Sequence, residues 1–208
     1  MSLKLGVILA GGQSSRMNGV NKAYLTLDGE TFLERAIKRA APQVNKLIVS
    51  TNTRIAENLN INIEVISDPV GSFGGGPLIG ILAAFNWAFK NFSDVEQIAS
   101  FAVDVPFFPR NLIQRFDDRI KKEESNINSC YACSDSLLHP IFSVSSFSLY
   151  DDLRAYINNG NRKVDKWMNK NRFLIEDFGN HSPDAFFNVN TPEDLECARK
   201  ISKDNPDF

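Results

Sequence analysis

The stretch "LAGGQSSRMNGVNKA" (residues 9–23) places two adjacent glycines and two cations, Arg16 and Lys22, directly after an apolar run. Glycine lets another group approach the backbone closely, and successive free N–H groups form a concave site for an anion. Arg16 and Lys22 would neutralise a polyphosphate bound there. Gly11 and Gly12 alone would make a tight turn in most proteins, which is the alternative. The spacing matches neither a G-x-G-x-x-G loop nor a Walker A loop, so we predict a different phosphate-binding loop.

Asp104, in "FAVDVPFFP" (residues 101–109), is a second residue that could do chemistry. It directly follows an apolar run, and Pro106 and Pro109 end that run. Mg²⁺ binds in proteins through one or two carboxylates together with phosphate oxygens and water. A carboxylate beside a polyphosphate loop is therefore a candidate metal ligand, whereas an isolated Asp at this place would be a turn or capping residue.

Asp68 follows another apolar run, "INIEVIS" (residues 61–67). A carboxylate there could accept both the N1 hydrogen and the 2-amino hydrogens of guanine. Neither adenine nor cytosine offers that pair of adjacent donors, so Asp68 could select the base. Pro69 leaves a simple turn as the alternative interpretation.

The elements that would position these residues alternate along the first half of the chain. Four continuous apolar runs are typical of parallel strands buried on both faces: residues 4–10, 45–51, 61–67 and 97–103. Thr31 and Glu34 form a capping box ahead of a helix, and Pro77 opens a second helix. We expect Phe85 and Phe89 of that second helix to belong to the core.

The second half predicts shorter elements. A helix over residues 110–122 precedes two strands that are close enough to pair, "INSCYAC" and "HPIFSVS", and a helix that ends at Gly160. "AFFNVN" (residues 185–190) reads as a strand, and Thr191 caps a last helix with Pro192 in its first position. The tail from residue 202 is expected to fray.

This alternation predicts one domain over residues 1–208, a three-layer α/β/α doubly wound fold. The sheet should be mostly parallel, with a small antiparallel addition in the second half. In such sheets ligands bind beyond the carboxyl ends of the strands. Residues 11–22, Asp68 and Asp104 should therefore meet at one edge.

Composition and net charge argue against some classes of partner and of cellular location. The 208 residues are 43% hydrophobic and 23% charged with a formal net charge of −2, and the sequence pI is about 5.7. That balance argues against nucleic acid or an anionic membrane as partner. No apolar run is long enough to cross a bilayer and no leader is recognisable, so we expect a cytoplasmic protein.

"CYAC" (Cys130 and Cys133) has the spacing of a metal or redox pair. Positions three apart in a strand point to opposite faces, and no second Cys or His pair lies nearby. We therefore interpret both as structural thiols.

Together with "GPLIGI", "HPIF" and "FFNVNTPED", the first loop and "VDVPFFP" resemble the nucleotidyltransferase family, most closely its molybdenum cofactor guanylyltransferase branch, from Leu9 to about Leu195. The resemblance implies the Rossmann-like nucleotidyltransferase fold and transfer of GMP from GTP to the phosphate of molybdopterin or molybdenum cofactor, with release of pyrophosphate. It implies Mg²⁺ as cofactor, and Mn²⁺ also suits oxygen ligands. Gly11 favours this branch over the cytidylyl branch, which usually carries Ala there.

The resemblance also assigns residues. A GTP-binding half would span about residues 1–110 and an acceptor-binding half about 111–208. Catalytic roles fall on Arg16, Lys22 and Asp104, and a metal would be held by Asp104 and Asn190. The nucleotide would contact Leu9, Ala10, Gly11, Gly12, Lys22, Ser50, Asp68 and Asp104.

The acceptor would contact His139, Asn188 and Asn190. Asn188 and Asn190 flank Val189 and would share one face of the predicted strand, where paired amides could bind a pterin edge. Asn190 shaping the turn before Thr191 is the alternative. Arg162 and Lys163 could hold the acceptor phosphate, although an exposed basic pair is more often solvated surface.

Three other functions compete with this one. Two are enzymes with the same loop and metal, namely a cytidylyltransferase acting on the same pterin and a nucleotidyltransferase for a sugar or another cofactor. The third is a non-catalytic nucleotide-binding module. For the enzyme we expect a monomer, with molybdoenzymes or their chaperones as partners.

Overall fold

The computed structural model describes residues 2–11, 21–52, 63–67, 75–92, 94–179 and 183–206. These residues form a seven-stranded sheet in the order β5-β4-β1-β6-β8-β7-β9. Its strands are β1 (Lys4–Leu9), β4 (Lys46–Ser50), β5 (Glu64–Ile66), β6 (Gln97–Ala102), β7 (Cys130–Ser134), β8 (Leu137–Ser146) and β9 (Leu174–Asp177). A separate two-stranded sheet pairs β2 (Thr26–Leu27) with β3 (Glu30–Thr31).

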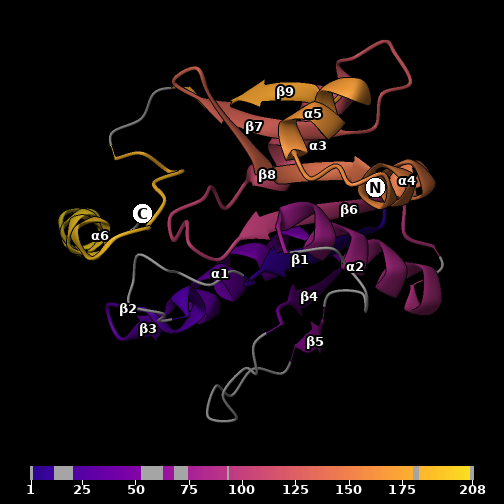
Figure 1. The fold of residues 1–208 in the computed structure, drawn as a ribbon. Helices are drawn as coiled ribbons and strands as arrows, with labels where there is room; N and C mark the ends of the chain where they lie inside the picture. Colours follow the sequence, from indigo (N-terminus) through magenta and orange to yellow (C-terminus); the bar gives the residue numbers. More distant parts are fainter. Residues whose placement is uncertain are drawn as a thin grey trace.

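Only β8 runs against its neighbours in the described sheet. β1 pairs in parallel with β4 and β6, β4 with β5, and β7 with β9, whereas β8 is antiparallel to both β6 and β7. In Figure 1 the arrows of β6 and β9 accordingly point left and that of β8 points right. The predicted fold class, a mostly parallel sheet with a small antiparallel addition, is confirmed.

Helices cover both faces of the sheet and make it the middle of three layers (Figure 1). One face packs against α1 (Phe32–Ala40), α3 (Leu112–Lys121) and α6 (Pro192–Asp204). The other packs against α2 (Pro77–Asn91), α4 (Tyr150–Asn158) and α5 (Val164–Lys170). Three-residue 3-10 helices are η2 (Lys22–Tyr24), η3 (Ala41–Gln43) and η4 (Phe147–Leu149). Burial on both faces explains why β1 and β6 read as continuous apolar runs.

Capping residues and a proline mark the N-terminal ends of three helices as predicted. Thr31 and Glu34 form both hydrogen bonds of the capping box at α1, and Pro77 occupies the first turn of α2. Thr191 caps α6, where Asp194 completes a second capping box. Each box satisfies backbone N–H groups that the first helical turn leaves open.

Three expectations about elements were wrong. "AFFNVN" is not a strand: the N–H of Val189 donates to the carbonyl of Asp104 at 2.9 Å rather than to a neighbouring strand. Phe89 is 66% exposed because it lies beyond the covered part of α2, where it stacks on Tyr150. The tail does not fray at residue 202, since α6 continues to Asp204 with Ser202 buried.

The cysteines of "CYAC" lie in β7 and are both free and buried. Burial raises the pKa of both thiols, to about 12 for Cys130. Protonated thiols are poor metal ligands. No group of three or more His, Cys, Asp or Glu side chains in the described ranges could hold a metal ion, and none of the helices they form is long and apolar enough to cross a membrane.

The loop of the β7–β8 hairpin has a strained backbone conformation, and a substitution there can test this. Its two loop residues, Asp135 and Ser136, have φ of 47° and 63°, which is the left-handed region that favours glycine. Replacing Ser136 with Gly should raise the free energy of unfolding by about 0.5–1 kcal/mol, measured by urea denaturation. Ser125, which is exposed and has no positive φ, provides the control: Ser125→Gly should give no gain. A loss of stability in Ser136→Gly would contradict the prediction.

Candidate active site

A pocket of about 350 Å³ opens at the carboxyl ends of the parallel strands, as expected for this fold. It lies beyond β1, β4 and β6 and beside the first turn of α2. Its lining residues are Leu9, Ala10, Gly11, Asn21, Lys22, Ser50, Asn52, Gly75, Gly76, Pro77, Gly80, Ala102, Val103, Asp104 and Ile141. Gly11, Lys22, the strand ends and Asp104 therefore line one pocket, whereas residues 12–20 and Asp68 lie outside the described residues.

The charged centre of this pocket is an ammonium group between two oxygens. Lys22 Nζ lies 2.8 Å from Asp104 Oδ2 and 2.5 Å from Asn190 Oδ1. The side chains of Lys22 and Asp104 are 16% and 22% exposed, so the pair is shielded but reachable from solvent. These three residues come from three separate parts of the chain.

Asp104 is held by its backbone and by the loop that follows it. Its carbonyl accepts the N–H of Val189, which is fully buried. Arg39 of α1, also buried, donates to the carbonyls of Phe107 and Phe108 at 2.8 and 2.7 Å. Burial lowers the pKa of the Arg39 guanidinium to about 10, which still leaves it charged at neutral pH. Helix α1 thereby fixes the path of the chain just after Asp104.

Lys22 begins the short helix η2, which orients it. The side chain of Asn21 accepts the N–H of Ala23 at 3.0 Å, and Ala23 is buried. The carbonyl of Lys22 accepts the N–H of Leu25 at 3.1 Å. The backbone of Lys22 is thus tied on both sides, and its long side chain reaches across the pocket to Asp104.

The first turn of α2 forms the opposite wall of the pocket. Its N-cap residue, Gly76, has no side chain to cap the helix and has φ of 136°. Pro77 has no N–H, and the N–H of Ile79 donates to the carbonyl of Gly76 at 3.0 Å, so it is the helix dipole that favours an anion at this terminus. Gly80 lets α2 approach β1 and β4: a Cβ there would lie 2.7 Å from Leu9 Cδ2 and 3.2 Å from Ser50 Oγ. The start of α2 and Lys22 therefore line the same pocket.

The same residues fit a divalent cation. Asp104 and Asn190 already present two oxygens to one positive group, and oxygen ligands are those that Mg²⁺ prefers. The described part of the pocket supplies one carboxylate, that of Asp104. The remaining ligands would have to come from phosphate oxygens and water, which is the usual arrangement for Mg²⁺ with a nucleotide.

His139 lies on β8, outside the residues that line the pocket. Its Nε2 is 2.8 Å from Ser134 Oγ, and its ring stacks on Phe186 with centroids 4.3 Å apart. Burial lowers the pKa of His139, opposed by Asp184, so the imidazole is neutral at pH 7. A neutral ring can present either a donor or an acceptor to a ligand.

The other predicted acceptor residues are not brought into the pocket. Asn188 is exposed, and with the predicted strand absent the two amides do not share a strand face. Arg162 donates to the carbonyls of Ile157 and Asn161, and Lys163 is exposed at the N-cap position of α5 without a capping hydrogen bond from its side chain. Of the acceptor set, only Asn190 contacts the charged centre.

Gly12, Arg16 and Asp68 lie outside the described residues, so their predicted roles stay predictions. Several pocket residues escaped the sequence reasoning, among them Asn52, Gly80 and Ile141. Gly80 had a signal, because it lies one helical turn after Gly76. For Asn52 and Ile141 the one signal was their place two residues after a predicted site residue, Ser50 and His139 respectively.

An open α/β sheet that gathers glycines, a helix N-terminus and a Lys–Asp–Asn cluster at its carboxyl edge defines a nucleotide-binding protein of the nucleotidyltransferase class. The family comparison is more specific: residues 6–173 match the model of the MobA-like NTP transferase domain. This chain belongs to that family.

Curated relatives match almost the whole chain. A protein of Nitrobacter hamburgensis named molybdenum cofactor guanylyltransferase is 35% identical over 198 residues, 95% of this chain and 93% of its own length. A protein of Shewanella baltica with the same name is 34% identical over 95% of this chain and 96% of its own length.

Solved structures agree on the fold. Molybdopterin-guanine dinucleotide biosynthesis protein A from Archaeoglobus fulgidus is similar with a TM-score of 0.72 and 24% identity, over 97% of this chain and all of that one. A CMP:2-keto-3-deoxy-manno-octonic acid synthetase complexed with CTP also gives 0.72, at 13% identity over 98% of this chain and 99% of its own. At these identities the likeness concerns the fold alone.

Proposed function

We propose that this protein transfers GMP from GTP to the terminal phosphate of molybdopterin or molybdenum cofactor, forming a guanine dinucleotide cofactor and pyrophosphate. The relatives named molybdenum cofactor guanylyltransferase support this at about a third identity over nearly the full length. The observation that carries it is the ammonium of Lys22 held between Asp104 and Asn190 beside the pocket at the carboxyl edge of the sheet.

The reaction needs no protein nucleophile. A phosphate oxygen of the acceptor forms a bond to the α-phosphorus of GTP, and the bond from that phosphorus to the bridging oxygen breaks. Pyrophosphate leaves with the electron pair of that bond. The acceptor phosphate is already ionised, so the protein must bring two anions together and stabilise the charge on the leaving group.

Lys22, the N–H of Gly11 and the dipole of α2 would supply positive potential for this work, and Arg16 would add to it. We propose that Asp104 and Asn190 hold Mg²⁺, which Mn²⁺ could replace. When bound, such a cation neutralises phosphate charge. The chain itself contributes the position of both oxygens, fixed through Val189 and α1.

The recognition of substrates is proposed from the sequence and the surroundings of the pocket. Ser50 and Asp68 would contact the guanosine, with Asp68 reading the N1 and 2-amino hydrogens. Asn190 would lie at the junction of the two substrates, and neutral His139 would face the acceptor. Arg162, Lys163 and Asn188 remain candidates for the acceptor phosphate and pterin.

We further propose two halves within one domain, GTP-binding over about residues 1–110 and acceptor-binding over about 111–208. A cytoplasmic monomer that passes its product to molybdoenzymes or their chaperones would fit this role. Sedimentation of the purified chain would test the monomer, and a mass of two or more chains would refute it.

Nucleotide selectivity tests the function directly. Calorimetric titration of the purified chain with GTP, CTP, ATP and UTP in Mg²⁺ should show preference for GTP, and Asp104→Ala should lose the dependence on Mg²⁺. Asp68→Asn should lower the preference for GTP over CTP by about 10-fold or more, because one guanine donor loses its acceptor. Preference for CTP would change the product, and binding without transfer to the pterin would favour a non-catalytic module.

A further inference from the structure

Asn190, the third residue of the charged centre, is held by its backbone at the start of α6. Its side-chain oxygen faces Lys22, while its backbone N–H donates to Asp194 Oδ2 at 2.9 Å. The same Oδ2 accepts the N–H of Thr191, also at 2.9 Å. One carboxylate oxygen thus holds two successive residues at the start of α6.

We propose that Asp194 is a positioning residue for the reaction, which holds the backbone of Asn190 so that its amide oxygen is directed at the Lys22 ammonium. The inference rests on the proposed function. Asp194 touches neither the reacting groups nor the pocket lining, so it acts through Asn190.

The backbone on the other side of Asn190 is also fixed. Val189, the preceding residue, is fully buried, and its N–H donates to the carbonyl of Asp104. Asn190 therefore sits between an anchor to the Asp104 loop and an anchor to α6. Without Asp194 the second anchor is lost, and the amide oxygen gains freedom to leave the position that it shares with Asp104.

The capping box of α1 shows that a helix cap does not require a hydrogen bond to the residue that precedes the cap. Glu34 Oε2 accepts the N–H of Thr31 at 2.8 Å and the Thr31 hydroxyl at 2.7 Å, and Thr31 Oγ1 accepts the N–H of Glu34. All of these bonds stay within the cap and its helix. Asp194 makes the equivalent bonds with Thr191 and one more to the residue before the cap.

The ionised form of Asp194 is the one that this arrangement favours. Its pKa is lowered, first by the N–H of Asn190 and further by Thr191 and the charge of Lys22, against the opposing effect of burial. A carboxyl group with a lowered pKa stabilises the fold above its ordinary pKa and loses that contribution as pH falls through the folded value. The positioning role itself rests on the two hydrogen bonds of 2.9 Å from the N–H groups of Asn190 and Thr191 to Asp194 Oδ2.

The two capping boxes provide a matched pair of variants. Asp194→Ala and Glu34→Ala each remove the N3 carboxylate of one box and should lower Tm by similar amounts. Only Asp194→Ala should also lower kcat for GMP transfer, by about 10- to 100-fold, as is typical when a partner that orients a ligand is removed. KM for GTP should change far less, because the nucleotide pocket is left intact. Glu34→Ala should keep kcat within about twofold.

A spectroscopic measurement separates this inference from the proposed function. The side-chain amide resonance of Asn190, identified by its loss in Asn190→Ala, should shift in Asp194→Ala and stay in place in Glu34→Ala. This readout needs no substrate. Absence of transfer by the wild-type chain would refute the proposed function, whereas an unmoved Asn190 resonance would refute the positioning role.

Two further variants keep the proposal testable if Asp194→Ala does not fold. Asp194→Asn keeps an oxygen acceptor at the same place and should recover most of the lost kcat, and Asp194→Ser should recover part of it. Equal losses of kcat in Asp194→Ala and Glu34→Ala would overturn the proposal. A loss in Asp194→Asn as large as that in Asp194→Ala would also overturn it, because charge rather than position would then be the cause.

Discussion

Replacing Asp104 with Ala should lower the rate of GMP transfer by at least about 10²- to 10³-fold, the typical cost of removing a group that stabilises developing charge. Asp104 is the only carboxylate that the described pocket residues offer to a cation. Its side chain is partly exposed, so water can solvate the Lys22 ammonium that it leaves behind. The fold should survive, and steady-state kinetics together with thermal unfolding would check both expectations.

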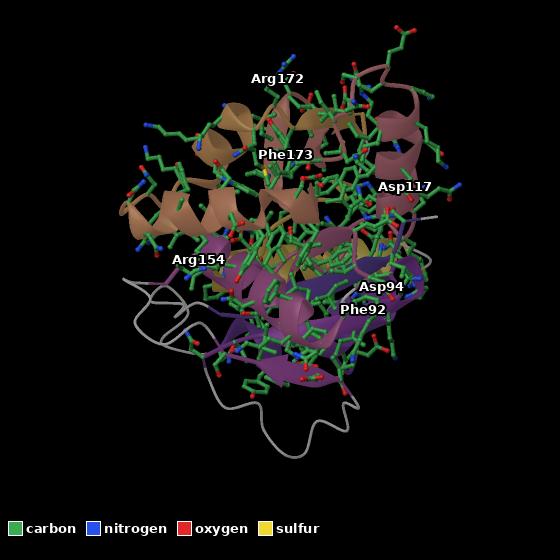
Figure 2. The ribbon with its side chains drawn as sticks, turned by 90° about the vertical axis from the view of Figure 1, so that its right-hand side faces the viewer. Phe92, Asp94, Asp117, Arg154, Arg172 and Phe173 are labelled. Carbon is green, nitrogen blue, oxygen red and sulfur yellow. The ribbon has the colours of Figure 1, made fainter. Side chains whose placement is uncertain are left out.

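Asp117 offers the control for this variant. Its carboxylate pairs with Lys4 at 3.0 Å, with a side-chain exposure of 25% that resembles the 22% of Asp104. Figure 2 shows Asp117 on the same side of the molecule as Phe92 and Asp94, which precede β6 and so mark the amino edge of the sheet. Asp117→Ala should leave transfer unchanged. Wild-type turnover in Asp104→Ala would refute the catalytic assignment.

The second large effect should come from Lys22→Ala, again at least about 10²- to 10³-fold in kcat. The alanine variant lacks the cation that neutralises the leaving pyrophosphate, and a methyl group cannot replace it. Lys38→Ala, which removes a largely exposed ammonium paired with Glu30, should leave kcat unchanged. Turnover of Lys22→Ala near the wild-type rate would show that pyrophosphate leaves without this charge.

Although Lys22→Ala should lower kcat, it should raise the affinity of the site for a divalent cation. The ammonium lies within 2.8 Å of Asp104 and 2.5 Å of Asn190, so a divalent cation must displace it when no nucleotide is bound. Removing about 1 kcal/mol or more of like-charge repulsion should raise the affinity for Mn²⁺ at least about fivefold. Titration of the nucleotide-free variant, followed by electron paramagnetic resonance, measures this directly. Unchanged affinity would mean that Lys22 and the metal occupy separate places.

The parallel strands could be predicted because their signals are local. A strand buried on both faces is mostly apolar, and β1, β4 and β6 are, apart from a polar residue at the first position of each strand and the small Ser50 and Ser100. Thr31 and Thr191 mark the starts of α1 and α6, because their side chains accept hydrogen bonds from backbone N–H groups of the first helical turn. Because carboxyl ends of parallel strands share an edge, the meeting of Gly11, Ser50 and Asp104 also followed.

The errors at Phe186 and Phe89 share a cause, which is that apolar character does not say what covers a residue. Phe186 is buried as a strand residue would be, but it packs against Phe142 and Phe178 from a loop. Phe89 has the spacing of a core residue, yet it stays 66% exposed with its ring stacked on Tyr150. Strand β9 was missed because a four-residue edge strand with Ile175 exposed carries little periodic signal.

The sequence by itself determined the class of fold, the edge at which ligands bind and the candidacy of Lys22 and Asp104, because each follows from residue types within short segments. Only the tertiary structure decided that the ammonium of Lys22 lies between Asp104 and Asn190, which are 82 and 168 residues away along the chain. It also decided that Asp194 anchors Asn190. Such contacts depend on how β6, η2 and α6 pack together, and no local pattern encodes that packing.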